Sequence, residues 1–595
     1  MAKGTIHKYL HLSYMQKWLL IAGSIGVVAG LGAIVFFEAI KWSTYLFLGL
    51  GAGYYPPAPL GEGQAVVREI ARRWMIPVIT TMGGLLSGLI VYNLAPEAEG
   101  HGTAIDAFHN KAGVIRARLP MVKMLASALV IGSGGSAGPE GPASEIGAGF
   151  GSLLAQKLRL NVVDRRIAVA AGLGAGIGAI FKAPLGGALL GTEIFYLQGF
   201  EIDALVPSFI ASLVGYTIFA GYFGYVPVFG QMSQNIALNL DAVTLVYYAL
   251  LGILCGLVGI LYSKTFYATR HLFKRLNGPA WLKPALGGLM VGIIGLFLPQ
   301  VLGVGYGWLQ MNMLNNPIPL ALVLVLVFAK ILATSLSIGS GGSGGVFAPG
   351  LFIGGMLGAA CWHALHGIVP YLPAYPEPFI LIGMMALFGA VARAPLAVMF
   401  MVVEMTGGYG LLVPAMIAVG LAYVLVGNNT IYESQVPTPA DSPAHRLDYY
   451  FPVLRETRVR DVMNTAPPMV TPQTPLLETR EMIFNRKVKG VLVVSPENDK
   501  LLMGVITRED IIRVPEDQRA RMTAGAAMSA PPIVIAPDET LDAALTLLSD
   551  HDIGLLPVTN GRELVGVVTR RIIVRSFMLA VRRLGEGAVS RLAGG

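Results

Sequence analysis

The chain has 595 residues, of which 54% are hydrophobic and only 13% are charged, and its formal net charge is +8. A water-soluble protein usually has about 25% charged residues, so this composition argues against a series of soluble domains. Abundant apolar residues and only two cysteines also exclude a disordered chain, a disulfide-stapled secreted domain and a collagen-like fibre.

Charged residues are spread unevenly along the chain, and this locates a domain boundary. Residues 446–595 contain 20 Lys and Arg and 18 Asp and Glu, whereas residues 1–445 contain only 23 and 17. We therefore predict a membrane domain over 1–445, surrounded by a lipid bilayer, and a water-soluble tail over 446–595. Short basic clusters between apolar segments place the N-terminus and the tail in the cytoplasm, and they form no stripe that would bind nucleic acid.

Fourteen apolar segments follow one another in the membrane domain, and several are too short to cross a bilayer. A complete span needs about 20 residues, so a shorter apolar helix that stops at Gly or Pro ends inside the membrane. Transporters use such broken helices to bind ions. The segments cover residues 18–40, 74–95, 121–131, 143–156, 167–181, 184–196, 205–225, 243–263, 283–303, 317–337, 346–366, 377–392, 395–405 and 411–427.

Two motifs recur in the same order, which indicates an internal repeat. The glycine-rich tract at residues 132–142 has a counterpart 207 residues further on, at residues 339–349. Downstream of each tract an Ala-Pro-Leu sequence precedes a glutamate, Glu193 or Glu404, with nine residues from proline to glutamate in both cases. We therefore expect two similar halves within the membrane domain.

Each glycine tract precedes an apolar helix, which we expect to begin near Glu140 in the first half and near Phe347 in the second. A helix N-terminus presents unpaired N–H groups and partial positive charge, which suit an anion. Glycines alone could instead serve close helix packing, but the matched Pro–Glu pairs favour an anion site in the membrane. A phosphate-binding loop is excluded, since neither tract continues with Gly-Lys-Ser or Gly-Lys-Thr.

Four separated motifs carry a resemblance that spans residues 15–440: GHGT at 100–103, GPEGP at 138–142, FKAPL at 181–185 and GVFAP at 345–349. Together they resemble the CLC family of chloride channels and proton-coupled chloride exchangers. The resemblance implies an all-α polytopic membrane protein of two inverted repeats with broken helices. It also implies a homodimer in which each subunit has its own pore, with chloride as the permeant ion and no required cofactor or metal ion.

By the same resemblance Glu140 is the gating glutamate, whose carboxylate occupies an anion site when ionised and leaves it when protonated. Taken alone, Glu140 could be only a helix cap, His101 could also cap a helix, and Tyr432 could belong to the aromatic belt at the membrane surface. The residues that the resemblance implies for anion binding are His101, Gly138, Gly141, Val346, Phe347, Ala348 and Tyr432.

Three departures from the family pattern bear on the mechanism. His101 replaces a frequent serine, Pro139 replaces the basic residue before the gating glutamate, and Ile194 stands where many exchangers have an inward-facing glutamate, with Glu193 one residue earlier. Since isoleucine cannot carry a proton, we predict passive, channel-like conduction of chloride. The alternative is proton–chloride exchange, with its proton path near Glu193 and Ile194, and fluoride transport is a second alternative.

The tail contains a repeat of its own, which resembles a tandem pair of cystathionine-β-synthase (CBS) domains at about 456–514 and 525–577. Such α/β pairs often bind adenine nucleotides through a Thr-x-x-Asp motif. Thr507 and Asp510 retain that spacing in the first domain, while the second has Ile572 in place of the aspartate. We therefore expect at most one adenine nucleotide site. The alternative is a tail that only dimerises or steadies the membrane domain.

Two other function classes fit the residues less well. A magnesium transporter needs oxygen ligands, often carboxylates, and the sequence gathers no acidic cluster at the repeated tracts. An enzyme is not expected, because the nine histidines show no metal-ligand spacing and no nucleophile–base motif is present.

Overall fold

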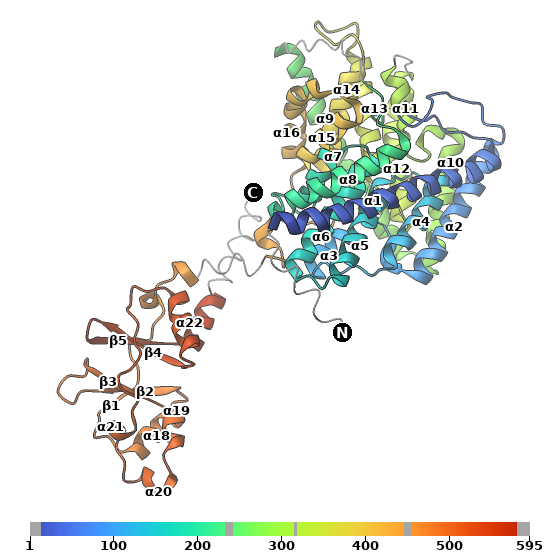
Figure 1. Cartoon of the computed structure of the whole chain (residues 1–595). Coiled ribbons are helices and arrows are strands. Elements are labelled where there is room, and N and C mark those ends of the chain that lie inside the picture. Colours follow the sequence, from blue (N-terminus) through green and yellow to red (C-terminus); the bar gives the residue numbers. More distant parts are fainter. Residues whose placement is uncertain (1–13, 101, 232–241, 315–317, 446–453, 580–595) are drawn as a thin grey trace. The chain divides into compact units, whose positions relative to one another are not determined.

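The computed structural model describes residues 14–100, 102–231, 242–314, 318–445 and 454–579 (Figure 1). Contacts between residues divide the chain into two compact units, Met1–Ala444 and His445–Gly595, called here the helical unit and the tail unit. The described part of the helical unit is built from helices, and the tail unit combines helices with strands.

The helical unit contains many apolar helices of unequal length. Among the described residues, eight helical segments are long and apolar enough to cross a membrane. The long first helix packs against the fourth, fifth, sixth and eighth helices (Figure 1). The helices are α1 (Tyr14–Thr44, continued by the wider turn η2, Tyr45–Ala52), α2 (Ile76–Leu94), α3 (Thr103–Asn110), α4 (Leu119–Gly132), α5 (Glu140–Lys157), α6 (Val162–Ile180), α7 (Pro184–Glu193), α8 (Leu205–Phe223), α9 (Ala242–Arg275), α10 (Lys283–Phe297), α11 (Tyr306–Met313), α12 (Leu320–Gly339), α13 (Phe347–Leu365), α14 (Glu377–Val391), α15 (Pro395–Thr406) and α16 (Leu412–Val426).

All fourteen apolar segments predicted from the sequence correspond to helices of this unit, and two helices were not predicted. These are α3 and α11, each eight residues long. Both follow a glycine in the left-handed conformation, Gly102 at φ +90° and Gly305 at φ +92°. Such short helices hold few apolar residues, so they produce no long hydrophobic segment in the sequence.

The glycine tracts end one helix and begin the next inside the unit. Gly134 and Gly341, at equivalent places in the two tracts, have φ values of +99° and +103°, which side chains rarely adopt. Directly after the tracts, α5 begins at Glu140 and α13 begins at Phe347, as the sequence predicted. Both helix starts are buried.

Glycine also allows backbones to pack closely in the centre of the unit. A Cβ on Gly147 of α5 would lie 2.0 Å from the carbonyl oxygen of Gly172 of α6. A Cβ on Gly354 of α13 would lie 2.3 Å from the carbonyl oxygen of Gly383 of α14. The packing role of small residues therefore exists alongside the turns that the glycine tracts form.

The tail unit contains two small sheets, one in each half. β1 (Met469–Val470) pairs in parallel with β2 (Gly490–Val494), which pairs antiparallel with β3 (Leu502–Thr507). In the second half β4 (Leu555–Asn560) pairs antiparallel with β5 (Glu563–Thr569). Buried apolar side chains of β2, β3, β4 and β5 form one shared cluster, so the two halves pack together. The helices are α18 (Leu476–Asn485), α19 (Arg508–Arg513), α20 (Glu516–Arg519), α21 (Ala524–Ala527) and α22 (Leu541–Asp550).

Candidate functional site

The two glycine tracts meet in the interior of the helical unit. The N–H of Gly138 donates to the carbonyl of Gly345 at 2.8 Å, and the N–H of Gly345 donates back to the carbonyl of Gly138 at 2.9 Å. A Cβ on Gly141 would lie 2.9 Å from the Cα of Gly345, so the two backbones are in contact. The N-terminal ends of α5 and α13 are therefore adjacent, although 207 residues separate the tracts.

Each tract also binds the loop that precedes the short helix of the other half. The N–H of Gly303, before α11, donates to the carbonyl of Gly134 in the first tract at 3.2 Å. The N–H of Gly100, before α3, donates to the carbonyl of Gly342 in the second tract at 3.3 Å. This crosswise arrangement brings the N-terminal ends of α3 and α11 to the same central region.

Two buried lysines hold these loops in place. Lys123 of α4 and Lys330 of α12 are 207 residues apart, which is the spacing of the repeat, and both are fully buried. The ammonium of Lys330 donates to the carbonyl of Gly303 at 2.7 Å, and that of Lys123 donates to the carbonyl of Gly100. The two halves thus fix equivalent loops with equivalent cations.

The surroundings of the two lysines differ in one respect. Lys123 Nζ lies 3.2 Å from Glu145 Oε2, whereas Lys330 Nζ lies 4.9 Å from the ring centroid of Phe352. Phe352 follows Glu145 by 207 residues and so replaces it in the repeat. The remaining oxygen of Glu145 accepts a hydrogen bond from the N–H of Thr103, at the start of α3, at 3.0 Å.

Glu140 lies where these elements converge. Its carboxylate is fully buried, and Oε1 accepts a hydrogen bond from the hydroxyl of Tyr306 at 3.3 Å. Oε2 accepts one from the backbone N–H of Ala348, in the first turn of α13, at 3.3 Å. A Cβ on Gly138 would lie 1.9 Å from this oxygen, so the position of the carboxylate requires glycine there.

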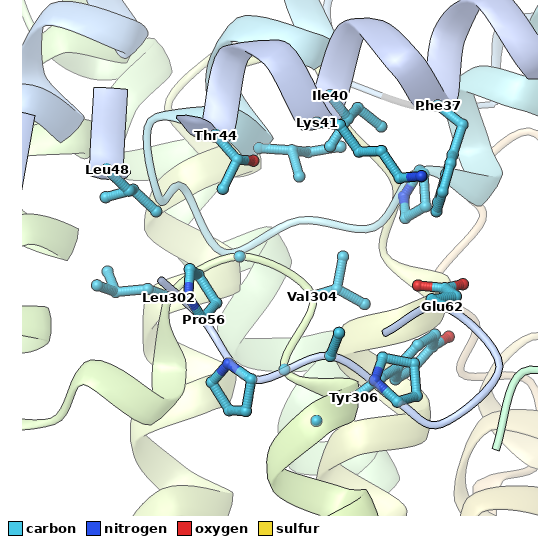
Figure 2. Close-up of a pocket in the computed structure, with 18 of the residues that line it drawn as sticks. Phe37, Ile40, Lys41, Thr44, Leu48, Pro56, Glu62, Leu302, Val304 and Tyr306 are labelled. Atoms are coloured by element: carbon cyan, nitrogen blue, oxygen red, sulfur yellow. The ribbon is translucent and has the colours of Figure 1, made fainter. Parts of the chain in front are cut away.

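Two cavities adjoin Glu140, and this residue lines both. The wide cavity has a volume of about 350 Å³ and lies between the end of α1, the loop 53–72 and the start of α11 (Figure 2). The narrow cavity, about 20 Å³, has room for about one water-sized particle. The N-terminal residues of α3, α5 and α13 line the narrow cavity, so three helix dipoles direct partial positive charge into it.

The structure brings most of the predicted site residues together. Gly141, Val346, Phe347 and Tyr432 line the narrow cavity, while Gly138 and Ala348 contact the carboxylate of Glu140 as described above. The position of His101 lies outside the described residues.

Aromatic rings fix the side chain of Phe347 at the boundary of the site. Its ring centroid lies 5.0 Å from that of Phe181 and 4.2 Å from that of Phe388. The hydroxyl of Tyr262 donates to the carbonyl of Val346 at 3.0 Å and so holds the backbone at the start of α13. The rings of Phe181, Phe347 and Phe388 bring no hydrogen-bond donor of their own to this part of the site.

Glu193 and Ile194 occupy different surroundings although they are neighbours in the chain. Ile194 lines the narrow cavity. The carboxylate of Glu193 instead accepts a hydrogen bond from the N–H of Ala397, at the start of α15, at 2.8 Å. Glu404 of α15 in turn accepts one from the N–H of Gly186, at the start of α7, at 2.7 Å. Each repeated glutamate thus caps the helix of the other half.

Three polar contributors to the site were not predicted from the sequence: Tyr306, the Lys123–Glu145 pair, and Glu62, which lines the wide cavity. Tyr306 could have been found, because the Gly-x-Gly sequence before it at 303–305 repeats the one at 100–102. The equal spacing of the two lysines is a second such signal. Glu62 lies in a loop with no repeated counterpart, so no pattern in the sequence pointed to it.

In the tail unit Thr507 and Asp510 form a cap at the start of α19. The N–H of Thr507 donates to Asp510 Oδ2 at 2.8 Å, and the Thr507 hydroxyl donates to the same oxygen at 2.7 Å. Asp510 Oδ1 accepts from the hydroxyl of Ser529 at 3.3 Å. In the second half the Thr569 hydroxyl accepts from the N–H of Ile572, where no carboxylate is present.

Comparison with known families gives matches to both units. Residues 83–427 match the family described as Voltage gated chloride channel, which is more than half of the chain. Residues 459–517 and 524–579 each match the CBS domain.

Two relatives show how far the sequence similarity extends. A ClcB-like protein of Ralstonia nicotianae is 32% identical over 412 residues, which cover 68% of this chain and 92% of the relative. A protein of Yersinia pseudotuberculosis, named H(+)/Cl(−) exchange transporter ClcA, is 30% identical over 411 residues, which cover 67% of this chain and 82% of the relative.

Two solved structures share the fold. A slow cyanobacterial Cl⁻/H⁺ antiporter matches with a TM-score of 0.61 and 23% identity, over 71% of this chain and 97% of its own. A eukaryotic CLC transporter matches with a TM-score of 0.56 and 21% identity, over 94% of this chain and 98% of its own. The predicted fold class, a helical multi-span membrane domain followed by an α/β CBS pair, is thereby confirmed. The chain belongs to the CLC family of anion-transporting membrane proteins, which are not enzymes, and it carries a tandem pair of CBS domains.

Proposed function

We propose that this protein exchanges chloride for protons across the membrane, with Glu140 as the group that both gates the anion path and carries the proton. The observation that carries the proposal is the position of the Glu140 carboxylate, which lines both cavities and accepts a bond from the N–H of Ala348. The name of the Yersinia relative as an exchange transporter favours coupling. The channel-like mode predicted from the sequence depends on Ile194 alone.

The gate follows from competition between two anions for the same donors. When ionised, the Glu140 carboxylate accepts hydrogen bonds from Tyr306 and Ala348, and the residue lines both cavities. Chloride that reaches this point needs the same N–H group and repels the carboxylate. Protonation removes the repulsion, so the side chain can leave and carry its proton into the wide cavity. Because chloride and the Glu140 side chain occupy this position in turn, the movement of chloride is coupled to the movement of protons.

The narrow cavity is the proposed chloride site. Its donors are backbone N–H groups at the starts of α5 and α13, near Gly141 and Phe347, with the Tyr432 hydroxyl as a further ligand. The ammonium of Lys123, which lies 3.2 Å from the cavity-lining Glu145, is paired with that carboxylate. Uncharged N–H and O–H donors bind the anion more weakly than a cationic side chain would, so the ion can leave the site again.

A flux measurement with an imposed chloride gradient tests the proposed exchange. In liposomes that contain the purified protein, chloride flow should drive protons in the opposite direction against their own gradient. Glu140→Gln and Glu140→Ala should abolish the proton movement and leave chloride flow insensitive to pH. Chloride flow without any proton movement in the unaltered protein would establish the channel-like alternative. Substituting fluoride, bromide or nitrate for chloride in the same assay distinguishes fluoride transport.

For the whole chain we propose a homodimer, with residues 1–445 as the transport domain and residues 446–595 as the CBS pair. From the basic clusters between the apolar segments we infer that the N-terminus and the tail lie in the cytoplasm. These assignments rest on the family and on the distribution of charge.

We also propose that the CBS pair binds one adenine nucleotide, with Asp510 as the acceptor for its ribose hydroxyls. Thr507 and Ser529 hold the carboxylate of Asp510 in place. In calorimetry with the full-length protein and ATP or AMP, binding should be lost in Asp510→Asn. It should be kept in Asp517→Asn, which changes an exposed residue of α20. Absence of binding in the unaltered protein would leave the tail with a structural role.

A further inference from the structure

A second carboxylate, that of Glu62, is fixed on the wall of the wide cavity. It lies in the loop 53–72, on a turn that neighbouring elements hold. The N–H of Gly61 donates to the carbonyl of Val228 at 2.9 Å, and the N–H of Leu60 donates to Gln310 Oε1 of α11 at 3.4 Å. A Cβ on Gly61 would lie 2.0 Å from the carbonyl oxygen of Pro227, so this turn packs tightly.

Four titratable groups from four elements face Glu62. Lys41 of α1, Lys182 after α6, Tyr306 of α11 and Glu140 of α5 all interact with its charge. Figure 2 shows the carboxylate of Glu62 at the same end of the wide cavity as the ammonium of Lys41 and the side chain of Tyr306. The Tyr306 hydroxyl, which donates to Glu140, also experiences the charge of Glu62. Tyr306 therefore connects the two carboxylates electrostatically.

The contacts of the two lysine ammonium groups that we describe are with groups other than the Glu62 carboxylate. The ammonium of Lys182 donates to the carbonyls of Gly61 at 3.2 Å and Val226 at 3.0 Å. The ammonium of Lys41 lies 4.4 Å from the ring centroid of Phe223. The two ammonium groups near Glu62 therefore contact backbone carbonyls and an aromatic ring. The Glu62 carboxylate is directed to the wide cavity (Figure 2).

The protonation equilibrium of Glu62 falls in the physiological range. Burial raises the pKa of the Glu62 carboxyl to about 7, although Lys182 and Lys41 favour its charged form. Near neutral pH both the protonated and the ionised forms are therefore populated. A group with this property is suited to accept and release protons repeatedly, because neither direction is strongly uphill.

We propose that Glu62 transfers protons between the solution and Glu140 through the wide cavity. The protonated Glu62 carboxyl releases its proton, the ionised Glu140 carboxylate gains one, and the Tyr306 hydroxyl or cavity water passes the proton between them without net change. Glu62 is then reprotonated from the solution. In the reverse direction the same steps return the proton from Glu140. This inference rests on the proposed role of Glu140 as the proton carrier.

The test uses the full-length protein in liposomes, with chloride and proton movement recorded together and the pH varied on each side in turn. Glu62→Gln should slow proton movement and coupled chloride movement by about tenfold or more, the order expected for loss of a proton-transfer group. Glu62→Asp, which retains a carboxyl, should restore part of the rate. The matched control is Glu69→Gln, an exposed glutamate of the same loop, which should behave as the unaltered protein.

A second background separates proton transfer from a simple effect of charge on the anion. In Glu140→Ala, where no gating carboxylate remains, Glu62→Gln should change the chloride flux far less than it slows coupled movement in the exchanging protein. Measurable flux in this background also shows that the altered protein is folded. The proposal would be overturned if Glu62→Gln slowed chloride movement equally in both backgrounds. It would also be overturned if the single variant Glu62→Gln moved protons and chloride as fast as the unaltered exchanging protein.

The outcome for Glu62 remains distinguishable if the exchange itself fails. If the unaltered protein moves chloride without protons, the pH dependence of its chloride flux still reports how Glu140 is protonated. A slower response of that flux to a pH jump in Glu62→Gln would support proton transfer by Glu62. An identical response would overturn it.

Discussion

The position of one carboxylate depends on a glycine two residues before it. Gly138 leaves the space that Glu140 Oε2 occupies, and its backbone simultaneously pairs with Gly345 of the second tract. The same residue therefore provides both the backbone pairing between the two halves and the space for the Glu140 carboxylate.

Gly138→Ala should displace the Glu140 carboxylate from its place between the cavities. The added Cβ would lie 1.9 Å from Oε2 and 2.9 Å from the Cβ of Ala348. A hydrogen bond to a charged group contributes about 1.5–3 kcal/mol, so loss of the bond to Ala348 should lower the occupancy of this position by about tenfold to a hundredfold. We expect faster chloride flux with weaker pH dependence in liposomes.

Gly23→Ala is the control for this substitution, since nothing lies within 4 Å of a Cβ at that position of α1. It should retain the flux and pH response of the unaltered protein. A Gly138→Ala protein with unchanged pH dependence would show that the carboxylate does not need the position seen here.

At the scale of residues, the sequence motifs predicted the site residues that lie within them but not those that come from other segments of the chain. Glu140, Phe347 and the glycines were predictable, because each lies within a repeated tract whose chemistry is visible in sequence. Tyr306 and Glu62 join the site from other segments, and their proximity to Glu140 arises only when the halves pack. Glu193 differs from these residues. Its repeated position was visible in the sequence, but its hydrogen-bond partner at the start of α15 was not.

At the scale of elements, the two halves stabilise each other by exchanging helix caps. Glu193 of α7 accepts from the start of α15, and Glu404 of α15 accepts from the start of α7. The repeated spacing of nine residues from proline to glutamate therefore has a structural reason: the proline begins the helix and the glutamate, at or near its end, reaches the other one. Carboxylates at helix N-termini satisfy unpaired N–H groups and the helix dipole.

Removing either cap should destabilise the helical unit by a similar amount. Glu193→Ala and Glu404→Ala each leave two backbone N–H groups without their acceptor, and loss of a helix cap costs about 0.5–2 kcal/mol. Thermal unfolding of the detergent-solubilised protein should show a lower midpoint for both variants.

Glu433→Ala provides the comparison, because Glu433 forms an exposed ion pair with Arg270, worth about 0–1 kcal/mol at most. Its unfolding midpoint should remain close to that of the unaltered protein. If all three variants had the same unfolding midpoint, the two helix caps would contribute nothing to stability.

The long apolar helices were predictable at this scale and the short ones were not. Fourteen segments were visible because each buries a run of apolar side chains. α3 and α11 have only eight residues each, and their positions depend on Gly102 and Gly305 and on the buried lysines that hold the preceding loops. Tertiary contacts, rather than local hydrophobicity, specify these two helices.

At the scale of the whole molecule, the charge distribution of the sequence agrees with two units of different character. The unit with few charges contains the spanning helices, the crosswise loops and both cavities, whereas the tail unit has ordinary charge density and two small sheets. The similarity to the Ralstonia relative covers 92% of that protein and 68% of this chain. The match to the voltage gated chloride channel family lies within the helical unit, at residues 83–427, and both CBS matches lie within the tail unit.

The most direct measurement of the central claim is the location of a heavy halide in Glu140→Ala. The claim is that the carboxylate occupies an anion position served by backbone N–H groups where the two halves meet. In crystals of this variant with bromide, anomalous diffraction should show bromide at the place vacated by the carboxylate, within hydrogen-bond distance of the N–H of Ala348. The account would be contradicted if bromide were bound elsewhere in the protein while this position and the narrow cavity stayed free of it.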